Sequence, residues 1–303
     1  MFNRKSEIVF IGAGKVAHTL IPLLIEKNYN VKGVMSRSIK SAKSIAKRFK
    51  INFYYYDISE IPAYFKIFFI TIPDDEIFAA AKKLSSLNLH FNDSLFVHTS
   101  GSESSEALKS LERKGGITAS FHIMQTFPSL KKTEIKNSFA AIETEDKSAE
   151  RFLFSLTRSL GLNGFKLSKE NKVYYHLAGV FTANFLNANF FSSQELIYRT
   201  GLTSKELSKL FDPIITTTLF NIKKMGVKNS LSGPVQRGDY LTIKKHITAL
   251  KKLKSGNKKL LLQSYISQSL VLLEIIKKQS KKLSKGWIEL KRILENELKN
   301  LKR

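Results

Sequence analysis

The amino-acid sequence predicts an α/β protein with an N-terminal doubly wound, mostly parallel sheet followed by an all-α C-terminal domain. Three observations support this fold class. Short apolar segments alternate with amphipathic ones in the first half of the 303 residues, a glycine-rich turn follows the first apolar segment, and helical periodicity dominates from Ser168 onward. Strands that alternate with helices, without long hairpins, are typical of a doubly wound sheet.

The first βαβ unit is expected at the N-terminus. Residues Glu7–Ile11 (EIVFI) form an apolar run that predicts a buried strand, and they lead into residues 12–17 (GAGKVA). This is the pattern GxGxxA, and the apolar residues that follow it recur every three or four positions, as in a helix. A second strand at Val31–Met35 completes the unit.

The alternation then continues to about Leu167. Helices are expected at 38–49, 75–84, 103–113 and from Ser148 to about Leu160; strands are expected at 52–56, 66–72, 95–98, 117–122 and 139–143, with a short segment at 164–167. A run of at least two dozen helix-compatible residues follows Ser168. This change of pattern places the domain boundary after Leu167, which gives domains of residues 1–167 and 168–303.

The second half carries several helix start signals and one loop. The starts are a capping box at Thr203 and Glu206, an N-cap with proline at Asp212–Pro213, and an N-cap at Asp239, with further helices from about Lys258 and Lys282. Residues 232–238 (SGPVQRG) are expected to form a loop.

The GxGxxA turn predicts a dinucleotide-binding site of the Rossmann type. Its glycines let the backbone approach a pyrophosphate, whose charge the N-terminus of the next helix stabilises. The alternative is a glycine turn without a ligand. The ligand of such a sheet lies beyond the carboxyl ends of its strands, so residues that follow later strands are also predicted to bind the cofactor. The predicted cofactor-binding residues are Gly12, Ala13, Gly14, Lys15, Val16, Ser36, Arg37, Ser38, Ile72, Pro73 and Ser100.

The end of the second strand favours NADP over NAD. An NAD site normally has a carboxylate here for the ribose 2′-hydroxyl, whereas this chain has Ser36-Arg37-Ser38. The guanidinium of Arg37 can bind a 2′-phosphate through two hydrogen bonds. The alternative is an arginine on a solvated loop.

Four segments carry a resemblance to a known family: residues 120–127 (SFHIMQTF), 175–178 (YHLA), 182–185 (TANF) and 231–239 (LSGPVQRGD). They resemble a family of Rossmann-like NADP oxidoreductases with an uncharacterised helical C-terminal domain, related to the superfamily of 6-phosphogluconate dehydrogenase and pyrroline-5-carboxylate reductase. The resemblance implies an NADP-binding domain over 1–167, a helical substrate and dimerisation domain over 168–303, and a homodimer formed through the helical domain. The family usually has His-Pro where this chain has His122-Ile123.

Two histidines and an asparagine are the catalytic candidates. Hydride transfer to a C=O or C=N bond requires a proton donor near the developing anion. His176 is the first candidate, because its helix is expected to face the cleft, and His122 is the second, because it ends a strand. The alternative for each is a buried structural histidine. Asn184 lies two turns beyond His176, rotated by about 80° on helical geometry, and could reach the same substrate.

Three polar residues are the substrate-binding candidates. Gln125 could bind a carbonyl group or cap a loop. Arg237 and Asp239, in a glycine-flanked segment, offer either a carboxylate clamp or an internal ion pair. The leading hypothesis is therefore an NADPH-dependent oxidoreductase that reduces a small anionic carbonyl or imine compound by hydride transfer. The alternative is a catalytically silent NADP(H)-binding sensor or regulatory protein.

Composition limits the other classes of function. The chain has no cysteine, which excludes disulfides and thiolate chemistry, and no histidine or acid spacing that predicts a metal site. The first residues, Met1–Ser6, are too short for a secretory signal, and the apolar run Val173–Ile197 is interrupted by polar residues. We therefore expect a cytoplasmic protein without a membrane partner.

The chain is strongly basic, with 50 Lys and Arg against 25 Asp and Glu. Residues 241–303 contain much of the excess, but there the lysines alternate with Leu and Ile at helical spacing. This pattern favours solvated helix faces over a polyanion site, so we do not expect a nucleic-acid partner.

Overall fold

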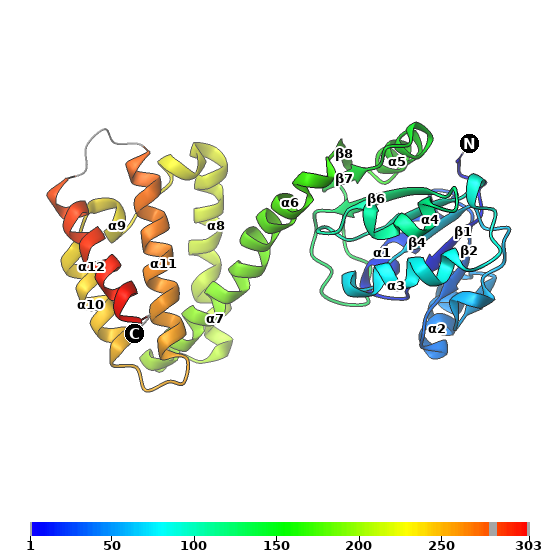
Figure 1. Ribbon diagram of the computed structural model, residues 1–303. Helices are drawn as coiled ribbons and strands as arrows, with labels where there is room; N and C mark the ends of the chain where they lie inside the picture. Colours follow the sequence, from blue (N-terminus) through cyan, green and yellow to red (C-terminus); the bar gives the residue numbers. More distant parts are fainter. Residues whose placement is uncertain (1, 279–283, 302–303) are drawn as a thin grey trace. The chain divides into compact units, whose positions relative to one another are not determined.

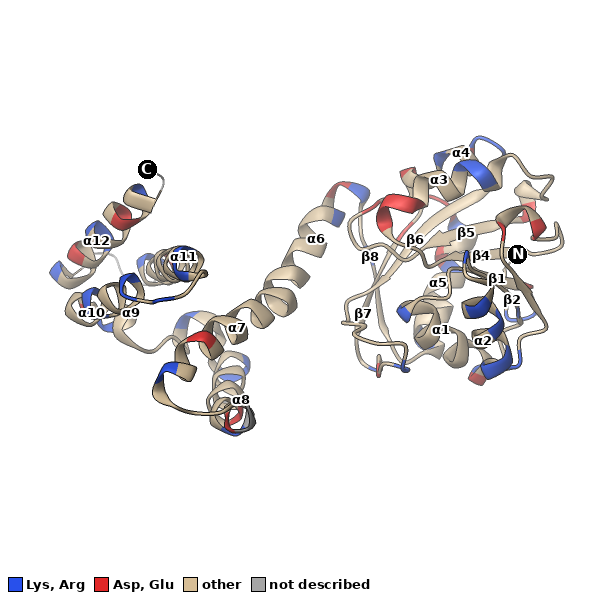
Figure 2. Ribbon diagram, turned by 90° about the horizontal axis from the view of Figure 1, so that it is seen from below, with Lys and Arg blue, Asp and Glu red and all other residues tan. Residues whose placement is uncertain are grey.

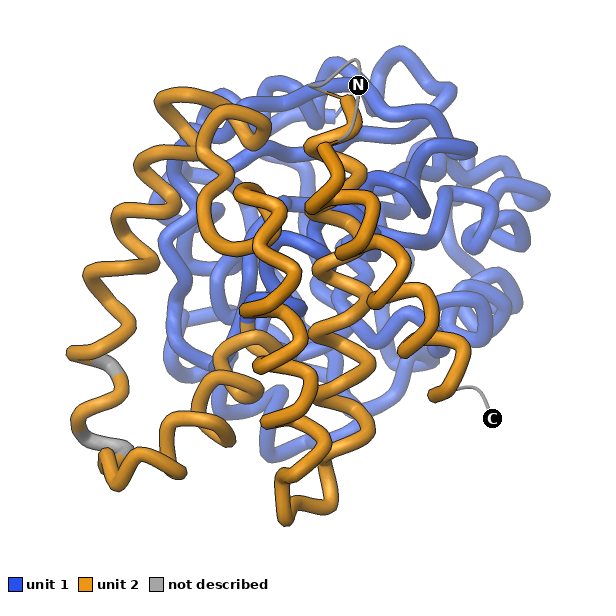
Figure 3. The backbone as a smooth tube through the Cα atoms, turned by 90° about the vertical axis from the view of Figure 1, so that its left-hand side faces the viewer, with its two compact units in different colours: residues 1–186 blue, residues 187–303 orange. Residues whose placement is uncertain are grey.

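The computed structural model describes residues 2–278 and 284–301 (Figure 1). The chain forms two compact units, Met1–Leu186 and Asn187–Arg303 (Figure 3). The domain boundary after Leu167 marks a change of sequence pattern, and it stays a prediction. Lys282, where the last helix was expected to begin, lies outside the described residues, and the helix is described from Lys285.

Among its described residues, the first unit contains one eight-stranded sheet of order β3-β2-β1-β4-β5-β6-β7-β8. The strands are β1 (Ile8–Ile11), β2 (Val31–Met35), β3 (Phe53–Tyr55), β4 (Ile67–Ile70), β5 (Leu95–His98), β6 (Ile117–Ile123), β7 (Phe139–Glu143) and β8 (Asn163–Lys166). Neighbours from β3 to β6 pair in parallel, β7 runs antiparallel to β6, and β8 is parallel to β7. The prediction of a doubly wound, mostly parallel sheet is confirmed.

Helices cover both faces of this sheet, because its central strands are apolar on both sides. The helices that pack on the sheet are α1 (Lys15–Glu26), α2 (Ile39–Phe49), α3 (Asp74–Ser85), α4 (Lys109–Glu112) and α5 (Lys147–Ser159). Phe10 of β1 belongs to the core formed with α1, α2 and α5, whereas its neighbour Ile11 belongs to the core formed with α3 and α4. Alternate residues of one strand thus pack against different layers.

Short 3₁₀ turns occupy several connections, at Ile58–Glu60, Phe91–Asp93, Ser105–Leu108, Lys169–Asn171 and Tyr198–Thr200. The helix expected at 103–113 is present only as the turn Ser105–Leu108 followed by α4, so its predicted length was wrong. A long helical run follows β8, as expected after Ser168: α6 (Lys172–Gly179), a π-helical turn (Val180–Asn184) and α7 (Phe185–Ile197).

The second unit is helical, with α8 (Ser204–Asn229), α9 (Pro234–Arg237), α10 (Tyr240–Lys251), α11 (Lys258–Lys277) and α12 (Lys285–Leu301). The capping box of Thr203 and Glu206 is confirmed at the start of α8. The start expected at Asp212–Pro213 was wrong, because the helix is already formed from Ser204 and continues through Pro213. The expected loop at 232–238 contains α9, since Pro234 at the first helical position presets the backbone.

The core of the second unit lies between α9, α10, α11 and α12. By length and composition alone, α11 is long and apolar enough to cross a membrane. The same properties suit a core helix, and α11 buries Leu262, Ile266 and Leu273 in this cluster. Lys and Arg residues are spread over α10, α11 and α12 rather than gathered on one of them (Figure 2), which agrees with solvated helix faces.

Candidate functional site

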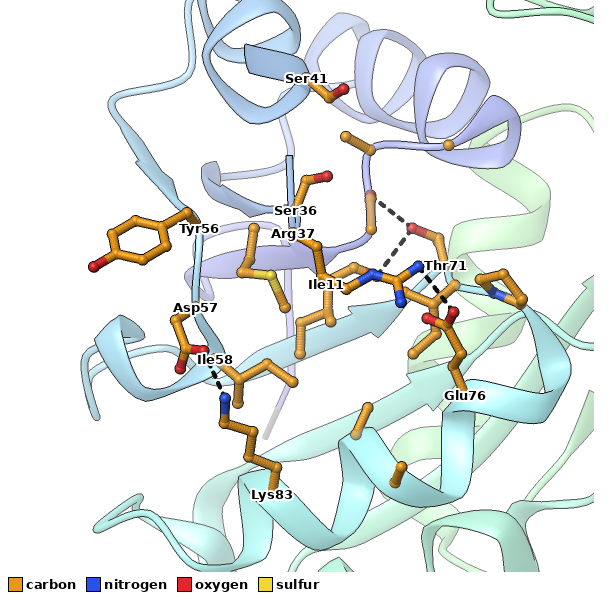
Figure 4. A pocket seen from close by; sticks show the side chains of 18 residues that line it. Ile11, Ser36, Arg37, Ser41, Tyr56, Asp57, Ile58, Thr71, Glu76 and Lys83 are labelled. Atoms are coloured by element: carbon orange, nitrogen blue, oxygen red, sulfur yellow. Dashed lines mark hydrogen bonds and ion pairs between the residues drawn. The ribbon is translucent and has the colours of Figure 1, made fainter. Parts of the chain in front are cut away.

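A cleft of about 560 Å³ lies at the carboxyl ends of β1, β2 and β4 (Figure 4). Its described lining is Ile11, Gly12, Ala13, Gly14, Met35, Ser36, Arg37, Ser41, Tyr56, Asp57, Ile58, Thr71, Ile72, Pro73, Glu76, Ala79, Ala80 and Lys83. Seven of the predicted cofactor residues are in this set. The other four, Lys15, Val16, Ser38 and Ser100, lie outside it, and their cofactor role stays a prediction.

The glycine turn is shaped by its contact with Thr71. Gly12 has a φ of +111°, and a Cβ atom there would lie 2.5 Å from the carbonyl oxygen of Thr71, so only glycine fits. The Thr71 hydroxyl donates to the carbonyl oxygen of Gly12 at 3.0 Å, which holds the turn against β4. Gly14 then caps α1, whose first N–H groups have no intrahelical acceptor. This arrangement suits a phosphate group.

Arg37 and Lys83 bring positive charge to the cleft, and both form ion pairs. The Nη2 atom of Arg37 lies 2.8 Å from Oε1 of Glu76, and the Nζ atom of Lys83 lies 2.6 Å from Oδ2 of Asp57. Hydrogen bonds from Lys83 and Ser59 hold the pKa of Asp57 well below its usual range. Sequence reasoning missed Asp57, Glu76 and Lys83, which follow from no motif.

A second cavity, of about 380 Å³, brings together four of the predicted site residues. It is lined by His122, Met124, Gln125, Thr126, His176, Ala178, Gly179, Val180, Thr182, Ala183 and Asn184. The rings of His122 and His176 are 6.0 Å apart between centroids. A Cβ atom on Gly101 would lie 2.6 Å from Nδ1 of His176 and 2.8 Å from Nε2 of His122. Both ring nitrogens therefore lie against the backbone of the loop after β5.

His122 is neutral at physiological pH. Burial lowers its pKa to about 4, and the nearby charges of Lys172 and His176 act in the same direction. Its Nδ1 atom is 3.2 Å from the hydroxyl of Tyr175, a group whose pKa burial raises to about 12. In its neutral form His122 can hydrogen-bond a substrate, and the choice of proton donor between the two histidines stays a prediction.

The π-helical turn changes where Asn184 lies. An α-helix turns by 100° per residue, so eight residues would separate Asn184 from His176 by about 80°. The i to i+5 bonding of the turn at Val180–Asn184 takes in about one extra residue. That residue rotates Asn184 back to within about 20° of His176. Both side chains consequently line the same cavity.

Lys172 is a buried lysine that sequence reasoning missed. Its side chain is only 1% exposed, and its Nζ atom donates to the carbonyl oxygen of Ser100 and to the hydroxyl of Ser120. Burial lowers its pKa to about 8, while the carboxylates of Glu143 and Asp74 act in the opposite direction. The available signal was its spacing of four residues from His176, which places the two on one helix face.

The loop after β5 is held by buried polar contacts. The Nδ1 atom of His98 accepts from the backbone N–H of Ser100, so its Nε2–H donates to the carbonyl oxygen of Ser104 at 3.0 Å. Burial lowers the pKa of His98 to about 3, which keeps this tautomer neutral. The Ser100 hydroxyl donates to Asp74 at 2.7 Å. These bonds fix the backbone that contacts the two cavity histidines.

Arg237 and Asp239 lie in the second unit. The carboxylate of Asp239 accepts from the backbone N–H and the hydroxyl of Thr242, at 3.0 and 2.7 Å, and so caps α10 as predicted. Arg237 ends α9 with an exposed side chain. Their substrate role stays a prediction. The described residues contain no group of His, Asp and Glu that could hold a metal ion.

Two family models match parts of the chain. Residues 138–269 match a domain of unknown function (DUF2520), and residues 2–97 match the shikimate/quinate 5-dehydrogenases. No curated protein matches the sequence.

Solved structures match nearly the whole chain. A protein from Bacteroides fragilis, named "putative NADP oxidoreductase BF3122", shares 24% identity with a TM-score of 0.75, covering 89% of this chain and 98% of its own. Protein TM1727 from Thermotoga maritima shares 28% identity with a TM-score of 0.66; the match covers 90% of this chain and 99% of TM1727. A pyrroline-5-carboxylate reductase from Coxiella burnetii shares 17% identity with a TM-score of 0.54; the match covers 92% of this chain and 100% of the reductase. The chain therefore shares the fold of these structures, and its residues 138–269 match the DUF2520 model, which confirms the resemblance inferred from its motifs.

Proposed function

We propose that the chain is an oxidoreductase that binds NADP(H) in the glycine-turn cleft and reduces a small carbonyl or imine compound in the histidine cavity. The observation that carries this proposal is that both cavities lie along the carboxyl edge of one sheet. β1 and β6 are three strand spacings apart, about 14 Å. A dinucleotide bound by its pyrophosphate at Gly14 would extend along this edge toward His122.

A small cavity of about 70 Å³ supports this path. It is lined by Val16 in the first turn of α1, Thr99 after β5, and His122, together with Leu20, Phe121, Ile123 and Phe127. His122 also lines the second cavity. The nicotinamide ring would therefore approach the two histidines from the side of α1.

The preference for NADP follows from Arg37 and its neighbours. The segment Ser36-Arg37-Ser38 has no carboxylate to accept a ribose hydroxyl, and Arg37 lines the cleft where a 2′-phosphate would lie. The B. fragilis structure with the same fold is named as an NADP oxidoreductase. Arg37→Ala should weaken NADPH binding much more than NADH binding.

The residue roles follow from the cavity. His176 would give the proton to the developing oxyanion or amine, and neutral His122 would hydrogen-bond the same group. Asn184 and Gln125 would orient the substrate. The binding of an anionic substrate group by Arg237, with Asp239 shaping its segment, is a separate proposal from the sequence, because neither residue lines either cavity.

We further propose a homodimer formed through α7 and α8, in the cytoplasm. No described side chain of α7 is buried, and Leu207 is the one buried side chain described in α8. Their exposed apolar residues include Phe191, Leu210, Ile214 and Phe220. So much exposed apolar surface on two long helices indicates a protein–protein interface, and a second copy of this chain has the same apolar surface to pack against it. Light scattering at micromolar concentration tests this.

Two measurements test the reductase. Calorimetry should show tighter binding of NADPH than of NADH; binding of neither would overturn the proposal. An NADPH-oxidation screen over 2-oxo acids, aldehydes and cyclic imines should find turnover that His176→Ala abolishes. Micromolar NADPH affinity without turnover on any compound would instead support the sensor.

A further inference from the structure

In the glycine-turn cleft the positive and negative side chains are equal in number, although the whole chain carries a formal charge of +25. Four of its described lining residues are charged at neutral pH: Arg37, Lys83, Asp57 and Glu76. Each cation is paired with one of the two carboxylates. The lining therefore offers no unpaired side-chain cation to an incoming phosphate. A phosphate that approaches the Nη2 group of Arg37 therefore competes with the carboxylate that already contacts it.

The ion pair of Arg37 with Glu76 crosses the cleft. Arg37 follows β2, and Glu76 lies in the first turn of α3, which follows β4. Because β2 and β4 flank β1, the two side chains meet above the carboxyl end of β1, beside the glycine turn (Figure 4). The side chain of Arg37 is 78% exposed, so it can turn away from Glu76 without unpacking.

We propose that Glu76 competes with the cofactor's 2′-phosphate for Arg37 and thereby limits the preference of this protein for NADP(H) over NAD(H). This inference rests on the proposed function. Binding of a 2′-phosphate exchanges one anionic partner of the guanidinium for another, so the net gain is the difference between the two contacts. A nucleotide with a 2′-hydroxyl makes no such exchange. Glu76 thus lowers the affinity of the protein for the phosphorylated cofactor.

The size of the effect follows from the exposure of the pair. Exposed ion pairs contribute little, and the usual range corresponds to about a 1.5- to fivefold change in affinity. Glu76→Gln should tighten NADPH binding by that factor and leave NADH binding nearly unchanged. Asp75→Asn is the matched control, because it removes a neighbouring exposed carboxylate from the same helical turn. It should leave the affinities for both nucleotides near those of the wild type.

A double-mutant cycle separates competition from simple charge repulsion. Dissociation constants for NADPH are measured by calorimetry for the wild type, Glu76→Gln, Arg37→Ala and the double variant. Competition for Arg37 predicts that Glu76→Gln has no effect when Arg37 is absent. An equal effect in both backgrounds would overturn the inference, since repulsion alone would explain it. An affinity of Glu76→Gln no higher than that of Asp75→Asn would also overturn it.

The same binding measurements distinguish an error in the proposed function from an error in the role of Glu76. If the wild type binds neither nucleotide, the dinucleotide site itself is wrong. If the wild type binds NADPH and Arg37→Ala weakens that binding while Glu76→Gln changes nothing, the NADP site stands and the role of Glu76 is overturned.

Discussion

The Nζ atom of Lys172 donates a hydrogen bond to the carbonyl oxygen of Ser100, at 3.2 Å, across 72 positions of the chain. This bond ties the first turn of α6 to the loop after β5. The next residue of the loop, Gly101, lies against the ring nitrogens of His122 and His176. One buried ammonium group therefore stabilises the backbone on which the geometry of the histidine cavity depends.

The burial of Lys172 should be visible in the pH dependence of stability. Its pKa is about 8 in the folded chain, below the ordinary value of 10.5. Between these pH values the unfolded state binds more protons, so this group makes the folded state more stable as pH rises. Relative to Lys172→Met, the wild type should gain up to about 1.4 kcal/mol of unfolding free energy per pH unit from about pH 8 to 10. Urea denaturation measures this gain. The exposed Lys82→Met serves as control, and parallel profiles for wild type and Lys172→Met would contradict the assignment.

Replacing Gly101 by alanine should damage the cavity without unfolding the protein. The added Cβ atom would lie closer than 3 Å to both histidine rings, which must then move. Displacement of catalytic groups by about 1 Å can cost on the order of 100-fold in rate. We expect a 10- to 100-fold lower kcat, with the dissociation constant for NADPH within about twofold of the wild type. Gly256→Ala, where the new Cβ meets nothing within 4 Å, is the control. Wild-type kinetics for Gly101→Ala would show that the histidines do not take part.

His176 and His122 should differ in their effects on catalysis. Loss of a general acid costs typically 10²- to 10⁴-fold in kcat, which is the effect expected for His176→Ala. His122 has a pKa of about 4, so it stays neutral from roughly pH 5.5 to 8. His122→Gln should therefore lower the rate without changing the shape of the pH–rate profile in this range. Replacing the exposed His90 by alanine should change neither the rate nor the shape of the pH–rate profile. A pH–rate inflection lost in His122→Gln would reverse the two assignments.

Asn184 should act on substrate binding. The π-helical turn places its amide on the side of His176, where it lines the cavity. Removing one hydrogen bond to a neutral group costs about 1 kcal/mol, which corresponds to a roughly fivefold higher KM for Asn184→Ala. Asn229→Ala, at the end of α8, should behave as the wild type. Equal KM values for the wild type and Asn184→Ala would place the substrate elsewhere.

Much of the fold could be predicted because the signals that specify it are local. The GxGxxA turn, the apolar strands and the Asp239 cap depend on residues a few positions apart, and the structure contains all three. Local signals failed where two of them competed. The capping box at Thr203 starts α8 before the proline signal at Pro213 is reached, and the helix continues through the proline.

The sequence by itself determined the doubly wound sheet, the position of the glycine turn and the residue types available to bind a phosphate or move a proton. Periodicity and turn chemistry act within one or two turns of the chain, so they can be read without the fold. Only the tertiary structure decided that Lys172 is buried against Ser100, that Arg37 is held by Glu76, and that one π-helical turn aligns Asn184 with His176. Desolvation and ion pairing depend on groups brought together from distant segments, and helix phase depends on how the backbone is packed. None of these follows from the order of residues alone.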